Sequence, residues 1–400
     1  MADVLPAPAA GGAHSQVPMT DKKYVYFHSG AEATYREVSD NPSSFTSIPT
    51  IDLADLDSGS LEDRKRIAKE IYDACHLCGF FYIKNHGIPQ SVADDAFALL
   101  KRFFALDTET KMSAHVQKNP AIRGYEPMME TQLDARTAGD VKEAFTMGDC
   151  VLEPEQDYVG KTSQQPPAKF KRPQNIWPKD VPWWREGIYK YYNSVYPLAM
   201  KLVRVFALGF GLEETAFDKD FRFPITGMRP LHYPPTPVDK DEASVGLGAH
   251  ADFSWLTLVL QEEGVPALEV LNQDGIWVGA PPERGTFVCN VGQYLERQSN
   301  GRFPATVHRV RNMTGKERYS LPFFLTPDPD VNLGVLDCCR DQQDGSAEGG
   351  SGEDNKAKYE PINVGDLYIR RILPARKKHP TSIRNINVPQ EQWSYDMLLQ

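Results

Sequence analysis

A short run of the sequence, residues 248–253 (Gly-Ala-His-Ala-Asp-Phe), places an imidazole and a carboxylate two positions apart. If this run is a strand, His250 and Asp252 point to the same side of it, because side chains alternate along a strand. A second histidine, His308, lies in a later β-type run. Two histidines and one carboxylate form a facial triad that holds Fe(II) and leaves neighbouring coordination positions open. The sequence therefore predicts an iron site at His250, Asp252 and His308.

A basic residue and a hydroxyl follow the second histidine closely. Arg318 and Ser320 lie two positions apart in a further β-type run, so that they share one strand face. A guanidinium group and a hydroxyl together bind a carboxylate through charge-assisted hydrogen bonds. A lone histidine in a strand is more often a packing residue than a ligand. The combination of a metal triad and a carboxylate clamp is far more specific than either alone.

Several segments are expected to position these side chains. Hydrophobic spacing predicts helices over residues 60–78, 90–107 and 183–210, with Gly79 ending the first. Regular structure is expected to begin with an extended run at 47–53, and residues 115–180 read as irregular and broken by prolines. Short β-type runs at intervals of roughly ten residues favour a sandwich or barrel, and they cover 228–233, 256–261, 268–271, 277–280, 286–291, 306–311 and 319–325.

Composition narrows the class of protein. The chain has 400 residues, a formal net charge of −10 and six cysteines. An acidic chain is a poor nucleic-acid binder, no apolar run is long enough to span a membrane, and so few cysteines indicate a reducing compartment. We expect a cytoplasmic protein, a monomer or weak homodimer, whose partner is a small-molecule substrate, with no nucleic acid and no membrane.

The predicted iron triad, the carboxylate clamp and several further short sequence blocks, taken in order along the chain, resemble the isopenicillin N synthase-like branch of the Fe(II)/2-oxoglutarate-dependent dioxygenases. The resemblance runs from about residue 47 to 335. The blocks that carry it are Ile48–Leu53, Cys78–Ile88, His250–Phe253, Leu256–Leu258, Leu268–Val270, Asn290–Gly292, Asn300–Phe303, His308–Val310 and Arg318–Phe324.

The resemblance implies an α+β fold with a mainly β core, a double-stranded β-helix (jelly roll) flanked by helices. It implies Fe(II) as the metal, 2-oxoglutarate as cosubstrate, dioxygen as oxidant and ascorbate as an accessory reductant. The distal carboxylate of 2-oxoglutarate would meet Arg318 and Ser320. Tyr233 stands where the family often places a tyrosine that also binds this carboxylate, and Arg229 would add positive charge nearby.

The resemblance also implies the reaction. Decarboxylation of 2-oxoglutarate to succinate would drive hydroxylation, desaturation or ring formation at a C–H bond of a small organic metabolite, in specialised metabolism. Phe324 is expected in the substrate pocket because it shares a strand face with Arg318 and Ser320. Four further residues, from segments where the family draws substrate contacts or where a bulky side chain would narrow the pocket, are expected to line it: Arg123, Tyr125, Phe145 and Trp255.

Other functions fit parts of this pattern. A 2-oxoglutarate-independent Fe(II) oxidase of the isopenicillin N synthase or aminocyclopropane carboxylate oxidase type also uses the arginine and serine pair. Tyr233 favours 2-oxoglutarate over that alternative. A silent binding protein on the same fold would not need the intact triad, and a protein hydroxylase would need a peptide-recognition module that the sequence does not suggest.

The chain is expected to divide into four regions. Residues 1–45 form a flexible arm, and 46–180 form an N-terminal region with helices and a substrate lid. Residues 181–335 contain the long helix and the catalytic jelly roll. Residues 336–400 form a C-terminal cap, in which 341–358 are rich in glycine, serine and charge and are expected to be a mobile loop.

Overall fold

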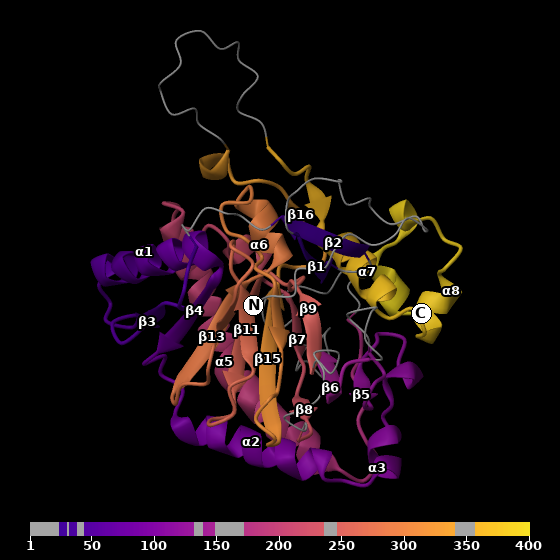
Figure 1. Cartoon of the computed structure of the whole chain (residues 1–400). Coiled ribbons are helices and arrows are strands. Elements are labelled where there is room, and N and C mark those ends of the chain that lie inside the picture. The colour runs from indigo at the N-terminus through magenta and orange to yellow at the C-terminus, as the bar shows by residue number, and fades with distance from the viewer. Residues whose placement is uncertain are drawn as a thin grey trace, which may run out of the picture.

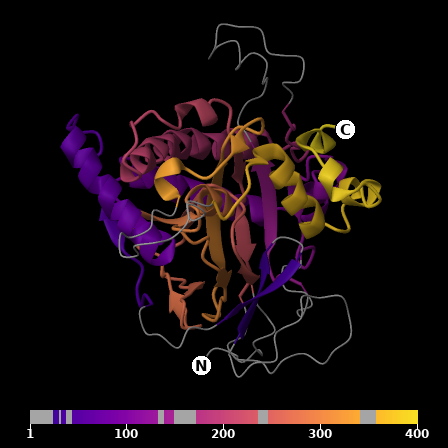
Figure 2. The ribbon, with the colours of Figure 1, turned by 90° about the horizontal axis from the view of Figure 1, so that it is seen from above.

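The protein is built from two β-sheets with helices packed outside the larger one (Figures 1 and 2). The computed structural model describes residues 24–29, 32–37, 44–131, 139–148, 172–235, 246–340 and 357–400. Buried side chains from both sheets meet in one apolar layer, which includes Leu231, Val270, Val288 and Val310. This facing pair of sheets is the jelly roll that the family resemblance implies.

The larger sheet has the order β3 (Thr50–Asp52), β4 (Phe80–Lys84), β13 (Thr286–Val291), β10 (Leu256–Gln261), β15 (Arg318–Thr326), β7 (Ile225–Met228), β6 (Glu143–Gly148) and β5 (Gly124–Glu126), and β8 (Leu231–Tyr233) pairs with β15 and β6. The side chains of strand β15 alternate between the two faces of the larger sheet. Leu321, Phe323 and Leu325 are fully buried on the helix side of the sheet, whereas the alternate residues line a cavity between the sheets.

The smaller sheet has the order β12 (Trp277–Gly279), β11 (Leu268–Leu271), β14 (His308–Val310), β9 (Leu247–His250), β1 (Tyr24–Ser29) and β2 (Glu32–Glu37). Strands β9 and β14, which carry the two predicted histidine ligands, are antiparallel neighbours in it. Strand β1 pairs with β9 in parallel.

Three long helices cover the outer face of the larger sheet: α1 (Leu61–Cys78), α2 (Gln90–Phe104) and α5 (Pro182–Gly209). Aromatic rings join α5 to the sheet, with Tyr192 against Phe323 and Phe206 against Phe81. Helix α1 ends at Gly79, as predicted. Gly79 has φ of 69°, and a Cβ atom there would lie 2.2 Å from the Pro304 carbonyl oxygen, so both conformation and space require glycine.

The C-terminal segment closes one end of the jelly roll (Figure 1). Helix α7 (Val364–Ala375) buries Leu367, Ile369 and Leu373. The remaining described α-helices and strands are α3 (Thr108–Met112), α6 (Gln293–Gln298), α8 (Pro380–Arg384) and a small sheet of β16 (Asn332–Leu333) with β17 (Ile362–Asn363). Among the described helices, none combines the length and the apolar character that crossing a bilayer requires.

Three expectations about the elements are corrected. Regular structure is present before residue 47, because β1 and β2, which cover residues 24–29 and 32–37, form a hairpin on the smaller sheet. The stretch 115–180 is not irregular throughout, since β5 and β6 extend the larger sheet. The run 228–233 is divided into β7 and β8, because Pro230 has no N–H for a ladder hydrogen bond. The predicted mobile loop, apart from residues 357 and 358, lies outside the described residues.

Candidate metal and cosubstrate site

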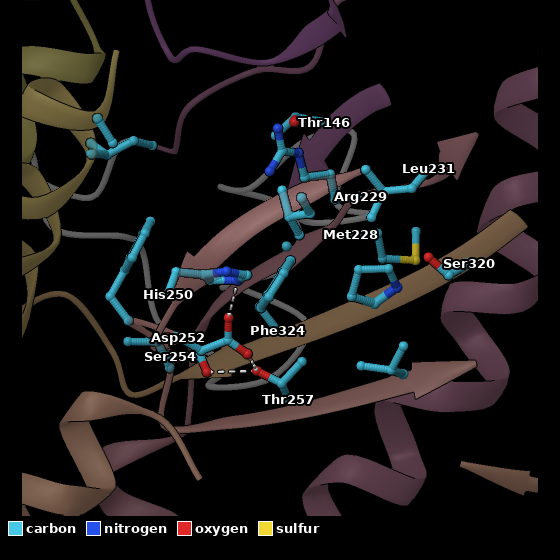
Figure 3. Close-up of a pocket in the computed structure, with 18 of the residues that line it drawn as sticks. Thr146, Met228, Arg229, Leu231, His250, Asp252, Ser254, Thr257, Ser320 and Phe324 are labelled. Atoms are coloured by element: carbon cyan, nitrogen blue, oxygen red, sulfur yellow. Dashed lines mark hydrogen bonds and ion pairs between the residues drawn. The ribbon is translucent and has the colours of Figure 1, made fainter. Parts of the chain in front are cut away.

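A cavity of about 190 Å³ lies between the two sheets and is bounded by helix α7. It is lined by strand residues from both sheets and is mainly apolar, with a few polar side chains directed into it (Figure 3). A cavity of this kind is the usual form of a small-molecule site. All three predicted iron ligands and all of the predicted 2-oxoglutarate contacts are among the lining residues.

The three predicted metal ligands lie together. His250 and His308 are directly opposite each other on β9 and β14, and Asp252 lies two residues beyond the end of β9. The His250 and His308 Nε2 atoms are 3.5 Å and 3.7 Å from Asp252 Oδ1, and the possible ligand atoms are within 4.8 Å of one another. The pairing of β9 with β14 therefore brings the triad together. Asp252, which was expected to share a strand with His250, lies just beyond the end of that strand.

Backbone carbonyls orient both imidazoles. His250 Nδ1 is 2.8 Å from the Gly248 carbonyl oxygen, and His308 Nδ1 is 3.1 Å from that of Thr306. Because a carbonyl oxygen only accepts, each Nδ1 must carry the proton, and each Nε2 is left with a lone pair. Both lone pairs face the Asp252 carboxylate, as a metal ligand set requires.

Two side chains orient the carboxylate. Thr257 Oγ1 and Asn290 Nδ2 donate to Asp252 Oδ2 at 2.7 Å and 2.8 Å. Figure 3 shows Asp252 between His250 and Thr257, with Phe324 projecting into the cavity beside them. Oδ1 is thereby turned toward the imidazoles. Thr257 and Asn290 were not predicted from the sequence, and the β10–β13 register, which pairs them, is what brings both to Asp252.

The protonation states suit a divalent cation. Burial opposes ionisation of Asp252, but the neighbouring His308 and His250 hold its pKa well below its ordinary value. Burial, with repulsion from His250, lowers the pKa of His308 to about 4. Near neutral pH the site therefore offers a carboxylate and a neutral His308 imidazole, the forms in which these groups bind metals. Two imidazoles and a carboxylate fit Fe(II).

The predicted carboxylate clamp (Arg318, Ser320 and Tyr233) lines the same cavity. Arg318 is buried, and its guanidinium lies 4.9 Å from the centre of the Tyr233 ring. Arg318 Nη1 donates to Ser320 Oγ at 3.3 Å, and Nη2 donates to Gln261 Oε1 at 2.9 Å. Gln261, which faces Ser320 across β10 and β15, was not predicted from the sequence.

Within the described part of the chain, two donors of this clamp are left without a partner. Arg318 Nε and the Tyr233 hydroxyl are buried and have no hydrogen-bond partner among the described residues. Burial raises the pKa of Tyr233, so its hydroxyl keeps its proton and can donate. Buried unpaired donors are costly. An anionic oxygen bound here would satisfy them, as the distal carboxylate of 2-oxoglutarate would.

The structure separates the predicted substrate residues into two groups. Phe324 and Arg123 line the cavity. Tyr125, Phe145 and Trp255 do not appear among the lining residues of the cavity and are buried in the core instead, which corrects their predicted role.

Core contacts explain these three positions. The Tyr125 hydroxyl donates to Glu143, Phe145 packs against Phe103, and Trp255 packs against Phe206 on α5. Trp255 Nε1 donates to Gln298 Oε1 at 2.7 Å. These side chains therefore pack in the core with the helices that cover the larger sheet.

Arg229 lines the cavity, as expected of a cosubstrate contact, but its Nη2 donates to Glu126 Oε2 at 2.8 Å. Its role toward 2-oxoglutarate stays a prediction. The contribution of helix α7, which brings Tyr368, Ile372 and Arg376 to the cavity, was not predicted from the sequence. The spacing of apolar residues on α7 indicates a buried face but not what that face covers.

Comparisons with known families agree with this geometry. A family model described as "non-haem dioxygenase in morphine synthesis N-terminal" matches residues 48–180. A second, the 2OG-Fe(II) oxygenase superfamily, matches residues 225–327, which contain all three predicted metal ligands and the clamp.

Curated relatives extend over most of the chain. The 2-oxoglutarate-Fe(II) type oxidoreductase hxnY of Emericella nidulans is 35% identical over 329 residues, which are 80% of this chain and 88% of the relative. The oxidoreductase of the same type ppzC of Metarhizium majus is 32% identical over 344 residues, 81% of this chain and 86% of the relative.

A solved structure shares the fold. A full-length Neurospora crassa protein, solved in complex with alpha-KG, matches with a TM-score of 0.69 at 24% identity. The match covers 83% of this chain and 97% of that one.

Proposed function

Because the chain belongs to the 2OG-Fe(II) oxygenase superfamily, we propose that it oxidises a C–H bond of a small organic metabolite at the cavity between its sheets. It is an Fe(II)- and 2-oxoglutarate-dependent oxidoreductase. The observation that carries the proposal is one cavity that holds both the triad of His250, Asp252 and His308 and the carboxylate clamp.

The chain's own residues would act mainly by holding and orienting. His250, His308 and Asp252 would bind Fe(II) through Nε2, Nε2 and Oδ1, and the hydrogen bonds from Thr257 and Asn290 keep Oδ1 directed at it. Bound Fe(II), 2-oxoglutarate and dioxygen supply the oxidising power when they are present together. In hydroxylation, one oxygen atom enters succinate, the other enters the substrate, and carbon dioxide leaves.

The clamp would fix the far end of the cosubstrate. Arg318 would neutralise the distal carboxylate, while Ser320 and Tyr233 would add hydrogen bonds to it. Phe324, whose ring lies beside His250 and Asp252, would limit where a substrate can lie and would exclude water from the reacting C–H bond. Which bond is oxidised follows from this positioning, so the residues around Phe324 would decide between hydroxylation, desaturation and ring formation.

The test is anaerobic loading of the purified protein with Fe(II) and 2-oxoglutarate, followed by exposure to air with a panel of metabolites. Succinate release and product mass are scored together. We expect succinate formation that rises with one class of metabolite and disappears in His250→Ala. Turnover that is undiminished without 2-oxoglutarate would instead support an oxidase of the isopenicillin N synthase or aminocyclopropane carboxylate oxidase type.

Finer points of this function are also proposals. We place the enzyme in specialised metabolism, with ascorbate as an accessory reductant. The cytoplasmic location, the monomeric or weakly dimeric state, and the independence of nucleic acid and membranes stay predictions from the composition.

A further inference from the structure

A cluster of charged side chains lies beside the cavity, around one buried carboxylate. Glu126 is fully buried, and its carboxylate accepts a hydrogen bond from Arg229 Nη2 at 2.8 Å and from Arg376 Nη2 at 3.3 Å. Lys142 Nζ, which is also fully buried, lies 3.6 Å from Glu126 Oε2. Arg229 and Arg376 both line the cavity. Two guanidinium groups of the cavity wall therefore share one carboxylate.

Not every donor of the cationic groups in this cluster is used by the described residues. Arg229 Nε, Arg376 Nε and Lys142 Nζ are buried and have no hydrogen-bond partner among the described residues. Burial, together with the nearby charge of Arg229, lowers the pKa of Lys142 to about 7. Asp140 also attracts Lys142 and Arg376, but its oxygens accept from Thr131 Oγ1 and the Gly248 N–H. Buried, unsatisfied cationic donors are costly unless an anion meets them.

A third arginine of the cavity wall has no acidic partner among the described residues. Arg123 is 7% exposed, and its Nη1 donates to the Pro173 carbonyl oxygen and to Asn175 Oδ1, both neutral acceptors. Within the part of the chain that the structure describes, no carboxylate lies at ion-pair distance from Arg123. We call Arg123, Arg229 and Arg376 the arginine cluster.

The arginine cluster is distinct from the carboxylate clamp. Arg318 begins β15 and pairs with Tyr233 on β8. Arg376 follows α7, and Arg123 precedes β5, so neither comes from a strand that carries the clamp. Figure 3 shows Arg229 and Thr146 together on one side of the cavity, away from Asp252 and Thr257. The Thr146 hydroxyl donates to Glu126 Oε1 at 2.6 Å, so Thr146 and Arg229 bind the same carboxylate.

The cavity surface that accompanies these arginines is apolar. Phe253 and Phe324, together with Tyr368 and Ile372 of α7, are among its lining residues. A ligand that fills this region would place hydrocarbon or aromatic surface against these side chains. Its polar group would meet guanidinium donors, which match a carboxylate through paired hydrogen bonds.

We propose that the arginine cluster binds a carboxylate of the primary substrate, so that the enzyme selects small apolar carboxylic acids over their neutral analogues. This inference rests on the proposed function, because it assigns the substrate class of the same cavity. Glu126 is then a positioning residue, which holds Arg229 and Arg376 at the wall without touching the substrate.

The test is binding of matched probes to the full chain loaded with Fe(II) and 2-oxoglutarate under anaerobic conditions. The probes are aryl and alkyl carboxylates, each paired with its carboxamide and led by phenylacetate and phenylacetamide. Isothermal titration calorimetry should show carboxylates binding at least about tenfold more tightly than their amides, the scale of one charge-assisted contact. Equal affinities across all pairs, or no binding by any carboxylate, would overturn the proposal.

Variants separate charge recognition from a general loss of structure. Arg376→Gln and Arg123→Gln should each reduce the carboxylate preference, whereas Arg376→Lys should retain most of it. Arg284→Gln is the matched control, because Arg284 is exposed and pairs with Glu263 away from this cavity. Circular dichroism and thermal unfolding would verify that each variant is folded.

The affinity for 2-oxoglutarate distinguishes the two anion sites. It should be unchanged in Arg376→Gln and Arg123→Gln, and a parallel loss would assign these arginines to the cosubstrate and overturn the proposal. The proposed function fails on another readout, the absence of metabolite-dependent succinate release. Succinate release with neutral substrates alone, unaffected by Arg376→Gln, would refute the carboxylate inference and leave the function standing.

Discussion

At the scale of single residues, the metal site depends on groups that never touch the metal. Thr257 and Asn290 occupy one oxygen of Asp252 and leave the other for coordination. Backbone carbonyls hold the Nδ1 atoms of His250 and His308 in the same way. These supporting contacts fix which atoms face the centre of the triad, and such contacts commonly tune metal affinity.

Thr257→Val should weaken Fe(II) binding while leaving all three ligands in place. The variant removes one of the two donors to Asp252 Oδ2, so the carboxylate is free to rotate away from the imidazoles. We expect roughly a 10–100-fold higher dissociation constant for Fe(II), measured anaerobically by competition with a chelator. Thr215→Val, at an exposed position, is the control. Unchanged affinity in Thr257→Val would show that the hydrogen bond does not orient Asp252.

Trp255→Phe tests the assignment of this indole to the core. The variant loses the Nε1 hydrogen bond to Gln298 and leaves a small void against Phe206. We expect a loss of about 1–3 kcal/mol in the free energy of unfolding, measured by urea denaturation. Probe affinity and product identity should not change. Altered substrate selectivity with an unchanged free energy of unfolding would show that Trp255 lines the pocket and is not a core residue.

At the scale of secondary-structure elements, the central strands follow from the sequence and the peripheral ones do not. Short runs of β-type residues predicted β10, β13 and β15 closely, because their packing and their local pattern agree. Strands β5 and β6 lie in a proline-broken stretch and exist through pairing with the sheet edge. A local pattern does not contain that information, and the same reason explains the unpredicted hairpin of β1 and β2.

The candidate site likewise contains residues that could be predicted from the sequence and residues that could not. That the triad and clamp residues lie around one cavity could be predicted, because their residue types and spacing are specific to one kind of chemistry. The positions of Tyr125 and Phe145 could not, since the side to which a residue turns depends on a strand that was not foreseen. Arg376 was missed because α7 reaches the cavity only through the tertiary fold.

Asp328, in the turn after β15, should make the stability of the protein depend on pH. Asp328 Oδ1 accepts from the Phe223 N–H at 2.7 Å and so ties this turn to the segment before β7. Burial raises the pKa of Asp328 to about 6, from an ordinary value of 3.8. The folded state therefore binds this proton more tightly than the unfolded state. The resulting stabilisation is complete below about pH 4 and is lost as the pH rises through about 6.

Asp328→Asn removes this titration while keeping an acceptor for the Phe223 N–H. The free energy of unfolding of the variant minus that of the wild type is the quantity compared. It should be larger by about 1–3 kcal/mol at about pH 8 than at about pH 4. Urea denaturation of both proteins at the two pH values measures the difference. A difference that is the same at both pH values would contradict the shifted pKa of Asp328.

At the scale of the whole molecule, an acidic protein presents a basic cavity. The net charge is −10, yet four arginines, Arg123, Arg229, Arg318 and Arg376, line the space around the predicted iron site. Local positive charge of this kind attracts anions against the overall field. The two-sheet frame makes the arrangement possible, because the larger sheet supplies the clamp, the smaller sheet supplies the histidines, and α7 closes the cavity with a further cation.

The central claim is that this cavity couples decarboxylation of 2-oxoglutarate to oxidation by dioxygen at an iron held by His250, Asp252 and His308. The most direct test is turnover under oxygen-18 gas with a metabolite that stimulates succinate release, followed by mass spectrometry of the succinate. The account predicts succinate that carries a single labelled oxygen atom, and no such product from His308→Ala. Unlabelled succinate, or labelled succinate formed equally well by His308→Ala, would contradict it.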